Sequence, residues 1–109
     1  MHLIGSIEWC SFPQLGVPTI KARVDSGAKT STIQADNVKP FIKDGQEWVK
    51  FDVTPIQDNR SIVVSCEERV TGRKLVKNTS GISEERLVVQ TIMQLGEHCW
   101  KVDLTLAKR

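Results

Sequence analysis

Apolar and polar residues alternate along most of the chain with a period of two, which is the period of an extended strand. Residues 17–24 show this most clearly, because Ile20, Ala22 and Val24 fall on one side of an extended chain. No segment sustains the longer periodicity of an amphipathic helix. The pattern therefore predicts a protein built mainly from β-strands.

The expected strands are separated by short polar or glycine-containing turns. We expect strands within residues 1–9, 17–24, 30–33, 47–54, 61–66, 87–95 and 99–106. Residues 36–44 contain Pro40 and are interpreted as a connection. Gly96-Glu97 is expected to begin a hairpin turn between the last two strands. Many short strands with turn signals favour an all-β barrel or sandwich.

Length, charge and cysteine content narrow the class of protein. The 109 residues suffice for one domain with a modest core. The formal net charge is +2 and basic residues are interspersed with acidic ones, so nucleic acid is not expected as a main partner. No signal peptide or membrane span is visible, and no membrane partner is expected. Cys10, Cys66 and Cys99 are an odd, widely spaced set, which favours reduced thiols and a cytoplasmic protein.

A polar turn directly follows the alternating residues 17–24. It begins with Asp25 and continues with Ser26, Gly27 and Ala28. A carboxylate at a strand end can aim its oxygens into a cleft, and glycine lets the backbone fold back and donate N–H groups toward it. Because Asp, Ser and Gly are also the commonest turn residues, an ordinary strand-ending turn is the alternative interpretation.

The sequence around this turn resembles a known family. Residues 8–31 are similar to the opening pattern of the family usually named ATP-dependent zinc proteases, which are retropepsin-like and associated with the glutamate ligase RimK. The matching positions are Trp9, Phe12, Pro13, Leu15, Gly16, Val17, Ile20, Ala22, Arg23 and the run from Val24 to Ser31. Further matches lie at residues 77–81, 85–89 and 95–109. The resemblance covers nearly the whole chain and implies an all-β, retropepsin-like closed barrel.

The resemblance also implies aspartic peptidase chemistry. Two facing carboxylates cannot both ionise, so they share one proton, and one acts as the base that activates water while the other acts as an acid. Because the chain has one such turn, Asp25 would need the second Asp25 of a homodimer, with the site on the two-fold axis. The implied turn residues are Ser26, Gly27, Ala28 and Thr30, and the implied flap residues over a peptide or protein substrate are Asn78, Thr79, Ser80 and Gly81. An ordinary hairpin loop is the alternative interpretation of the second set.

Basic residues next to the turn bear on the substrate. Arg23 and Lys29 flank residues 25–28 and either favour an acidic substrate or are solvated surface charges. Members of the resembling family are often encoded near ATP-grasp ligases that add glutamates to proteins, which hints at the trimming of acidic tails.

No cofactor and no metal are expected. The phosphate-loop pattern is absent because Ala28 separates Gly27 from Lys29, and there is no paired-histidine zinc motif. His98 and Cys99 are adjacent in an expected strand, so their side chains would point to opposite faces.

One departure from the family pattern concerns the end of the chain. The family continues into an apolar-apolar-Gly-Arg string that crosses behind the catalytic turn, whereas this chain stops at Arg109. We therefore expect a single domain over residues 1–109 that lacks this segment. The alternatives to a peptidase are a catalytically silent peptide-binding relative and a non-enzymatic β-barrel module.

Overall fold

The strands account for almost all of the described chain. The computed structural model describes residues 6–25, 29–54, 63–77 and 79–108. In chain order its elements are β1 (Ser6–Phe12), the single 3-10 turn η1 (Pro13–Leu15), β2 (Val17–Asp25), β3 (Thr30–Lys43), β4 (Gln46–Val53), β5 (Val64–Lys77), β6 (Ser83–Leu95) and β7 (His98–Lys108). This confirms the all-β prediction. No helix in the described part of the chain is long and apolar enough to span a membrane.

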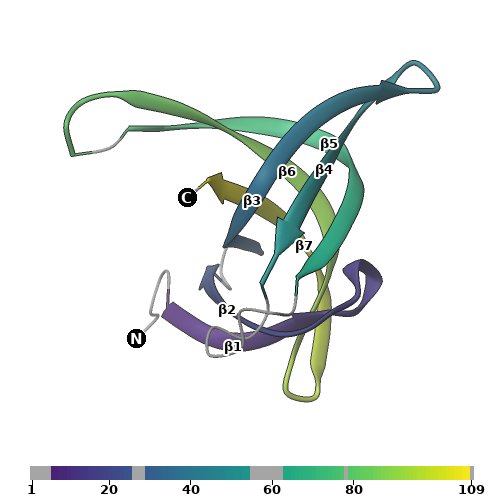
Figure 1. Ribbon diagram of the computed structural model, residues 1–109. Coiled ribbons are helices and arrows are strands. Elements are labelled where there is room, and N and C mark those ends of the chain that lie inside the picture. Colours follow the sequence, from purple (N-terminus) through teal and green to yellow (C-terminus); the bar gives the residue numbers. More distant parts are fainter. Residues whose placement is uncertain (1–5, 26–28, 55–62, 78, 109) are drawn as a thin grey trace.

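The strands close into a ring. Each strand pairs with the next one in sequence, and Ser11 of β1 pairs with Gln94 of β6, which joins β1 to β6. β7 crosses this ring, because it pairs with β6 on one side and runs parallel to β3 on the other. The β3–β4, β5–β6 and β6–β7 hairpins extend from the body in different directions (Figure 1).

The core follows the alternation seen in the sequence. Ile20, Ala22 and Val24 are buried along β2, as the period of two predicted. β7 buries Val102, Leu104 and Leu106 in the same way, and it also buries Thr105 between them. Thr105 is covered because it pairs with both Val88 of β6 and Thr32 of β3, so neighbouring strands flank it on both sides.

The interpretation of residues 36–44 as a connection is wrong. Residues 36–43 belong to β3, which pairs with β4 in this region. Pro40 is tolerated because residues 36–43 have a strand neighbour on one side only, where the missing N–H need not break a second ladder. A register shift between Asp36 and Lys39, with Asn37 at φ 52°, bends the strand at this point.

Two hairpin turns have the residues that their geometry demands. Asp44 and Gly45 join β3 to β4 with φ values of 53° and 74°, the two positive φ angles of a type I′ turn. Between β6 and β7, Gly96 has φ 61° at the first loop position, which glycine adopts without strain. The expected Gly96-Glu97 hairpin is therefore confirmed, since Leu95 pairs with His98 across it.

Candidate active site

The turn that carries Asp25 joins β2 to β3. Asp25 is the last residue of β2, and its backbone pairs with Thr30, the first residue of β3. Ser26, Gly27 and Ala28 lie outside the described residues, as does the side chain of Asp25. The structure thus places Asp25 at a strand end as predicted, and the catalytic role of Asp25 stays a prediction.

Two contacts hold the strands on either side of this turn. The buried Ser31 hydroxyl of β3 donates a hydrogen bond of 2.9 Å to the backbone carbonyl of Arg23 in β2. On the other side, the Asp103 N–H of β7 donates to the Lys29 carbonyl at 3.1 Å. Sequence reasoning did not assign a role to Ser31 or Asp103. For Ser31, the small hydroxyl side chain just after the turn was a signal that could have been used. For Asp103 there was no such signal, because β7 lies far from the turn in the sequence.

Replacing Ser31 by Ala should lower the free energy of unfolding by about 1 kcal/mol, because a buried hydroxyl bond is lost and the Arg23 carbonyl loses its side-chain donor. Urea unfolding followed by circular dichroism measures this. Ser83→Ala makes the same chemical change at the exposed start of β6 and should shift stability by less than about 0.5 kcal/mol. Equal losses in both variants would contradict the role given to Ser31.

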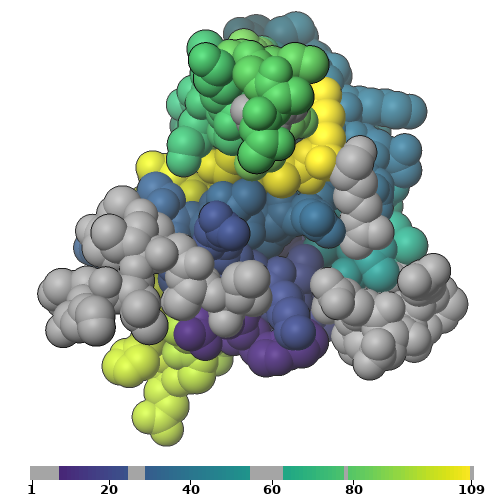
Figure 2. Space-filling model, turned by 90° about the vertical axis from the view of Figure 1, so that its left-hand side faces the viewer, coloured from purple at the N-terminus to yellow at the C-terminus, as the bar shows by residue number. Residues whose placement is uncertain are grey.

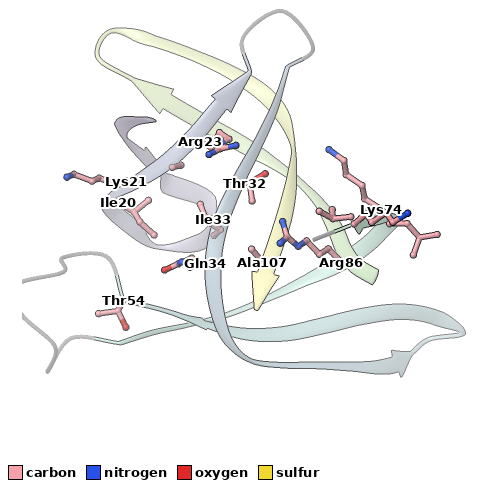
Figure 3. A pocket seen from close by; sticks show the side chains of 14 residues that line it. Ile20, Lys21, Arg23, Thr32, Ile33, Gln34, Thr54, Lys74, Arg86 and Ala107 are labelled. Carbon is pink, nitrogen blue, oxygen red and sulfur yellow. The ribbon is translucent and has the colours of Figure 1, made fainter. Parts of the chain in front are cut away.

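A cavity opens where β2 and β3 separate beyond the Arg23–Thr32 pair. It has a volume of about 840 Å³ and is lined from β2, β3, β5, β6 and β7 (Figure 3). Its charged lining residues, within the described part of the chain, are all cationic: Lys21, Arg23, Lys74, Lys77 and Arg86. We call this the cationic cavity. Arg23 therefore lies on it as well as next to the turn, whereas Lys29 is exposed and does not line it.

The predicted flap residues lie at the end of a long hairpin. Thr79, Ser80 and Gly81 are exposed in the turn between β5 and β6, and Asn78 lies outside the described residues. We call residues 73–77 and 79–87 the arm. The arm protrudes from the body above β7 (Figure 2). Residues 74–77 of the arm line the cationic cavity, so the arm and the strand leading to Asp25 border one space. This confirms a hairpin tip, and the flap role stays a prediction.

An ion-pair network fixes the base of the arm. The Arg73 guanidinium donates from Nη1 to Glu47 Oε1 at 2.7 Å, and from Nε to Glu85 Oε1 at 2.9 Å. It therefore joins β4, β5 and β6. The hydrogen bond from Arg73 holds the pKa of the Glu47 carboxyl below its usual range, so this pair stays charged at neutral pH.

The thiols and possible metal ligands do not gather into a second site within the described residues. All three cysteines are free, and burial raises the pKa of both Cys10 and Cys66 to about 11. These two thiols are protonated at neutral pH and are poor nucleophiles. No group of three His, Cys, Asp or Glu side chains among the described residues is placed to hold a metal ion.

Comparison with known proteins decides the family. Residues 3–109 match the model of the RimB-like family, described as the retropepsin-like aspartic endopeptidase RimB. The chain belongs to the RimB-like family. The RimB-like description names a peptidase fold class and mentions neither ATP nor zinc.

Relatives of this RimB-like chain include much longer proteins. The chain is 52% identical over 107 residues to proteins named "Probable alpha-L-glutamate ligase" from Shewanella pealeana and Desulfotalea psychrophila. A protein with the same name from Parasynechococcus marenigrum is 50% identical. The match covers 98% of this chain but only 23% of each relative, so the chain spans about a quarter of their length.

A solved structure shares the fold. A crystal structure of a Legionella pneumophila protein of unknown function superposes with a TM-score of 0.66 at 24% identity. The superposition covers 97% of the RimB-like chain and 74% of the Legionella protein. At this identity the likeness shows the fold alone.

Proposed function

We propose that this chain is a retropepsin-like aspartic peptidase that hydrolyses peptide bonds in acidic, glutamate-rich segments. The observation that carries the proposal is the cationic cavity, whose described charged residues are all Lys or Arg. A hollow lined by one sign of charge concentrates ligands of the opposite sign. The similarity to proteins named glutamate ligases supports glutamate as the acidic residue.

Catalysis in this proposal uses one Asp25 from each of two copies. The paired carboxylates share one proton, so the ionised member takes a proton from water while the protonated member polarises the scissile carbonyl. The water oxygen forms a bond to the carbonyl carbon, and the C–N bond breaks as the amine is protonated. Ser31 and Asp103 act indirectly, because their hydrogen bonds hold the strands at either side of the turn.

The arm has the proposed role of a lid over bound peptide. Its exposed tip at Thr79, Ser80 and Gly81 can close over a chain that lies in the cationic cavity, and the Arg73 network anchors its base. The cytoplasm is the proposed compartment, since three free cysteines are typical of a reducing environment.

Peptide hydrolysis tests the proposal directly. We expect the full-length protein to cleave an oligoglutamate peptide and to leave an oligoglutamine peptide of equal length intact, with products identified by mass spectrometry. The rate should fall as salt rises, because ions screen exposed charges over about 8–10 Å. Cleavage of both peptides at the same rate would contradict the acidic specificity.

Binding without cleavage is the second candidate function. It is favoured by the names of the long relatives, in which the matched segment is a quarter of a protein named a ligase. In that case the cationic cavity would hold an acidic peptide without hydrolysing it. Tight oligoglutamate binding, no products, and a monomer by sedimentation at high micromolar concentration would establish this function instead.

A further inference from the structure

Two cationic residues face each other across the arm. Lys74 of β5 pairs directly with Arg86 of β6, and both line the cationic cavity. Like charges directly opposite on neighbouring strands repel and destabilise a sheet. An anion bound between the two side chains would offset this repulsion.

Arg86 has hydrogen-bonding capacity that its neighbours leave unused. Its Nε is buried and has no hydrogen-bond partner among the described residues. Buried donors of this kind are rare, because an unpaired buried N–H loses the water that it would otherwise bond. The Arg86 side chain keeps only 24% of its surface exposed, and Figure 3 shows it directed towards the strands of Ile33 and Ala107.

The single ionic contact of Arg86 in the described structure is weak. Arg86 Nη2 lies 3.5 Å from Glu84 Oε2, beyond the usual range of an N–H···O hydrogen bond. Arg73 on the same arm, by contrast, has close hydrogen-bond partners. Its Nε donates to Glu85 at 2.9 Å and its Nη1 donates to Glu47 at 2.7 Å. Arg73 is thus committed to holding the arm, whereas the fork of Arg86 is open to a carboxylate.

We propose that Arg86 and Lys74 form a subsite for a side-chain carboxylate of the bound peptide, and that Glu84 is an internal competitor for Arg86. The subsite rests on the proposed function, because it would bind one side chain of the same acidic peptide. A glutamate or aspartate side chain would accept two parallel hydrogen bonds from Arg86, and the one from Nε, which is buried in the free protein, requires neighbouring side chains to move aside. Lys74 would add a point charge, and Glu84 would swing towards solvent.

Binding of a fluorescent oligoglutamate peptide to the full-length protein tests this subsite. Anisotropy is measured with Asp25→Asn in the background of every protein, so that the probe stays intact. Arg86→Gln should weaken binding by about tenfold to a hundredfold, since hydrogen bonds to charged groups are lost. Glu84→Gln should tighten binding severalfold, because the competitor loses its charge.

Matched variants separate the subsite from the general field of the protein. Arg69→Gln removes the same charge from an exposed site on β5 that does not line the cavity, and should change affinity less than about twofold. Glu85→Gln removes an acidic charge that pairs with Arg73, and should not tighten binding as Glu84→Gln does. Arg86→Lys keeps the charge without the fork and should recover only part of the affinity.

Several outcomes would overturn the proposal. Equal losses in Arg86→Gln and Arg69→Gln would show a diffuse electrostatic effect, and full affinity in Arg86→Lys would show that the fork is not used. If Arg86→Gln fails to fold by circular dichroism, the Arg86→Lys and Glu84→Gln results decide the question. If oligoglutamate is hydrolysed and its KM is unchanged in Arg86→Gln, the subsite proposal is wrong and the peptidase proposal stands. If binding depends on Arg86 but no hydrolysis occurs, the peptidase proposal is wrong and the subsite proposal stands.

Discussion

Asp25→Asn should abolish peptide hydrolysis and leave the fold of the domain unchanged. The substitution keeps the shape of the side chain, but it removes the ionisable oxygen, so the dimer loses both the base and the shared proton. One general base contributes roughly two to four powers of ten to the rate, and loss of a pair that acts as one unit costs more. Product formation from oligoglutamate, measured against wild type at equal dimer concentration, gives the result.

Asp44→Asn is the matched control for this substitution. Asp44 lies exposed in the β3–β4 hairpin turn, and asparagine tolerates its φ of 53°. Activity should therefore stay close to wild type. Activity that survives Asp25→Asn and disappears on addition of a chelator would show that the reaction depends on a metal and that the carboxylate mechanism is wrong.

Phe12→Ala should give the largest loss of stability, about 3–5 kcal/mol, because it empties a fully enclosed site. Phe12 ends β1 with 0% of its surface exposed, directly before η1. Domains are stable by only about 5–15 kcal/mol, so this loss removes a large share of the total free energy of unfolding. Urea unfolding at low temperature, where the variant stays folded, measures the difference.

Phe41→Ala makes the same change on the outward side of β3. Phe41 is half-buried and the Lys50 ammonium lies 5.6 Å from its ring centroid, so its removal leaves no closed cavity. The expected loss is about 1 kcal/mol or less. A loss in Phe41→Ala as large as that in Phe12→Ala would mean that β3 and β4 contribute to the core far more than their burial indicates.

Strands were predicted correctly where apolar and polar residues alternate strongly. The prediction failed where a single proline was given more weight than the surrounding residues. Residues 17–24 matched β2 closely, because one face of that strand is buried along its length. Because of Pro40, residues 36–44 were predicted to be a connection, whereas β3 continues to Lys43. The Asp44-Gly45 pair was the overlooked signal, since this dipeptide favours a two-residue hairpin and therefore a strand on each side.

The sequence by itself determined the β class, the position of Asp25 at a strand end, and the hairpin tip at residues 79–81. These features depend on local alternation and on turn residues, which act over a few neighbouring positions. Only the tertiary structure decided that β7 runs parallel to β3 and that Lys21, Arg23, Lys74 and Arg86 border one cavity. Those residues come from strands far apart in the chain, and their meeting depends on pairing energies summed over the whole ring of strands. For the same reason, the contrast between the satisfied Arg73 and the unsatisfied Arg86 is visible only in three dimensions.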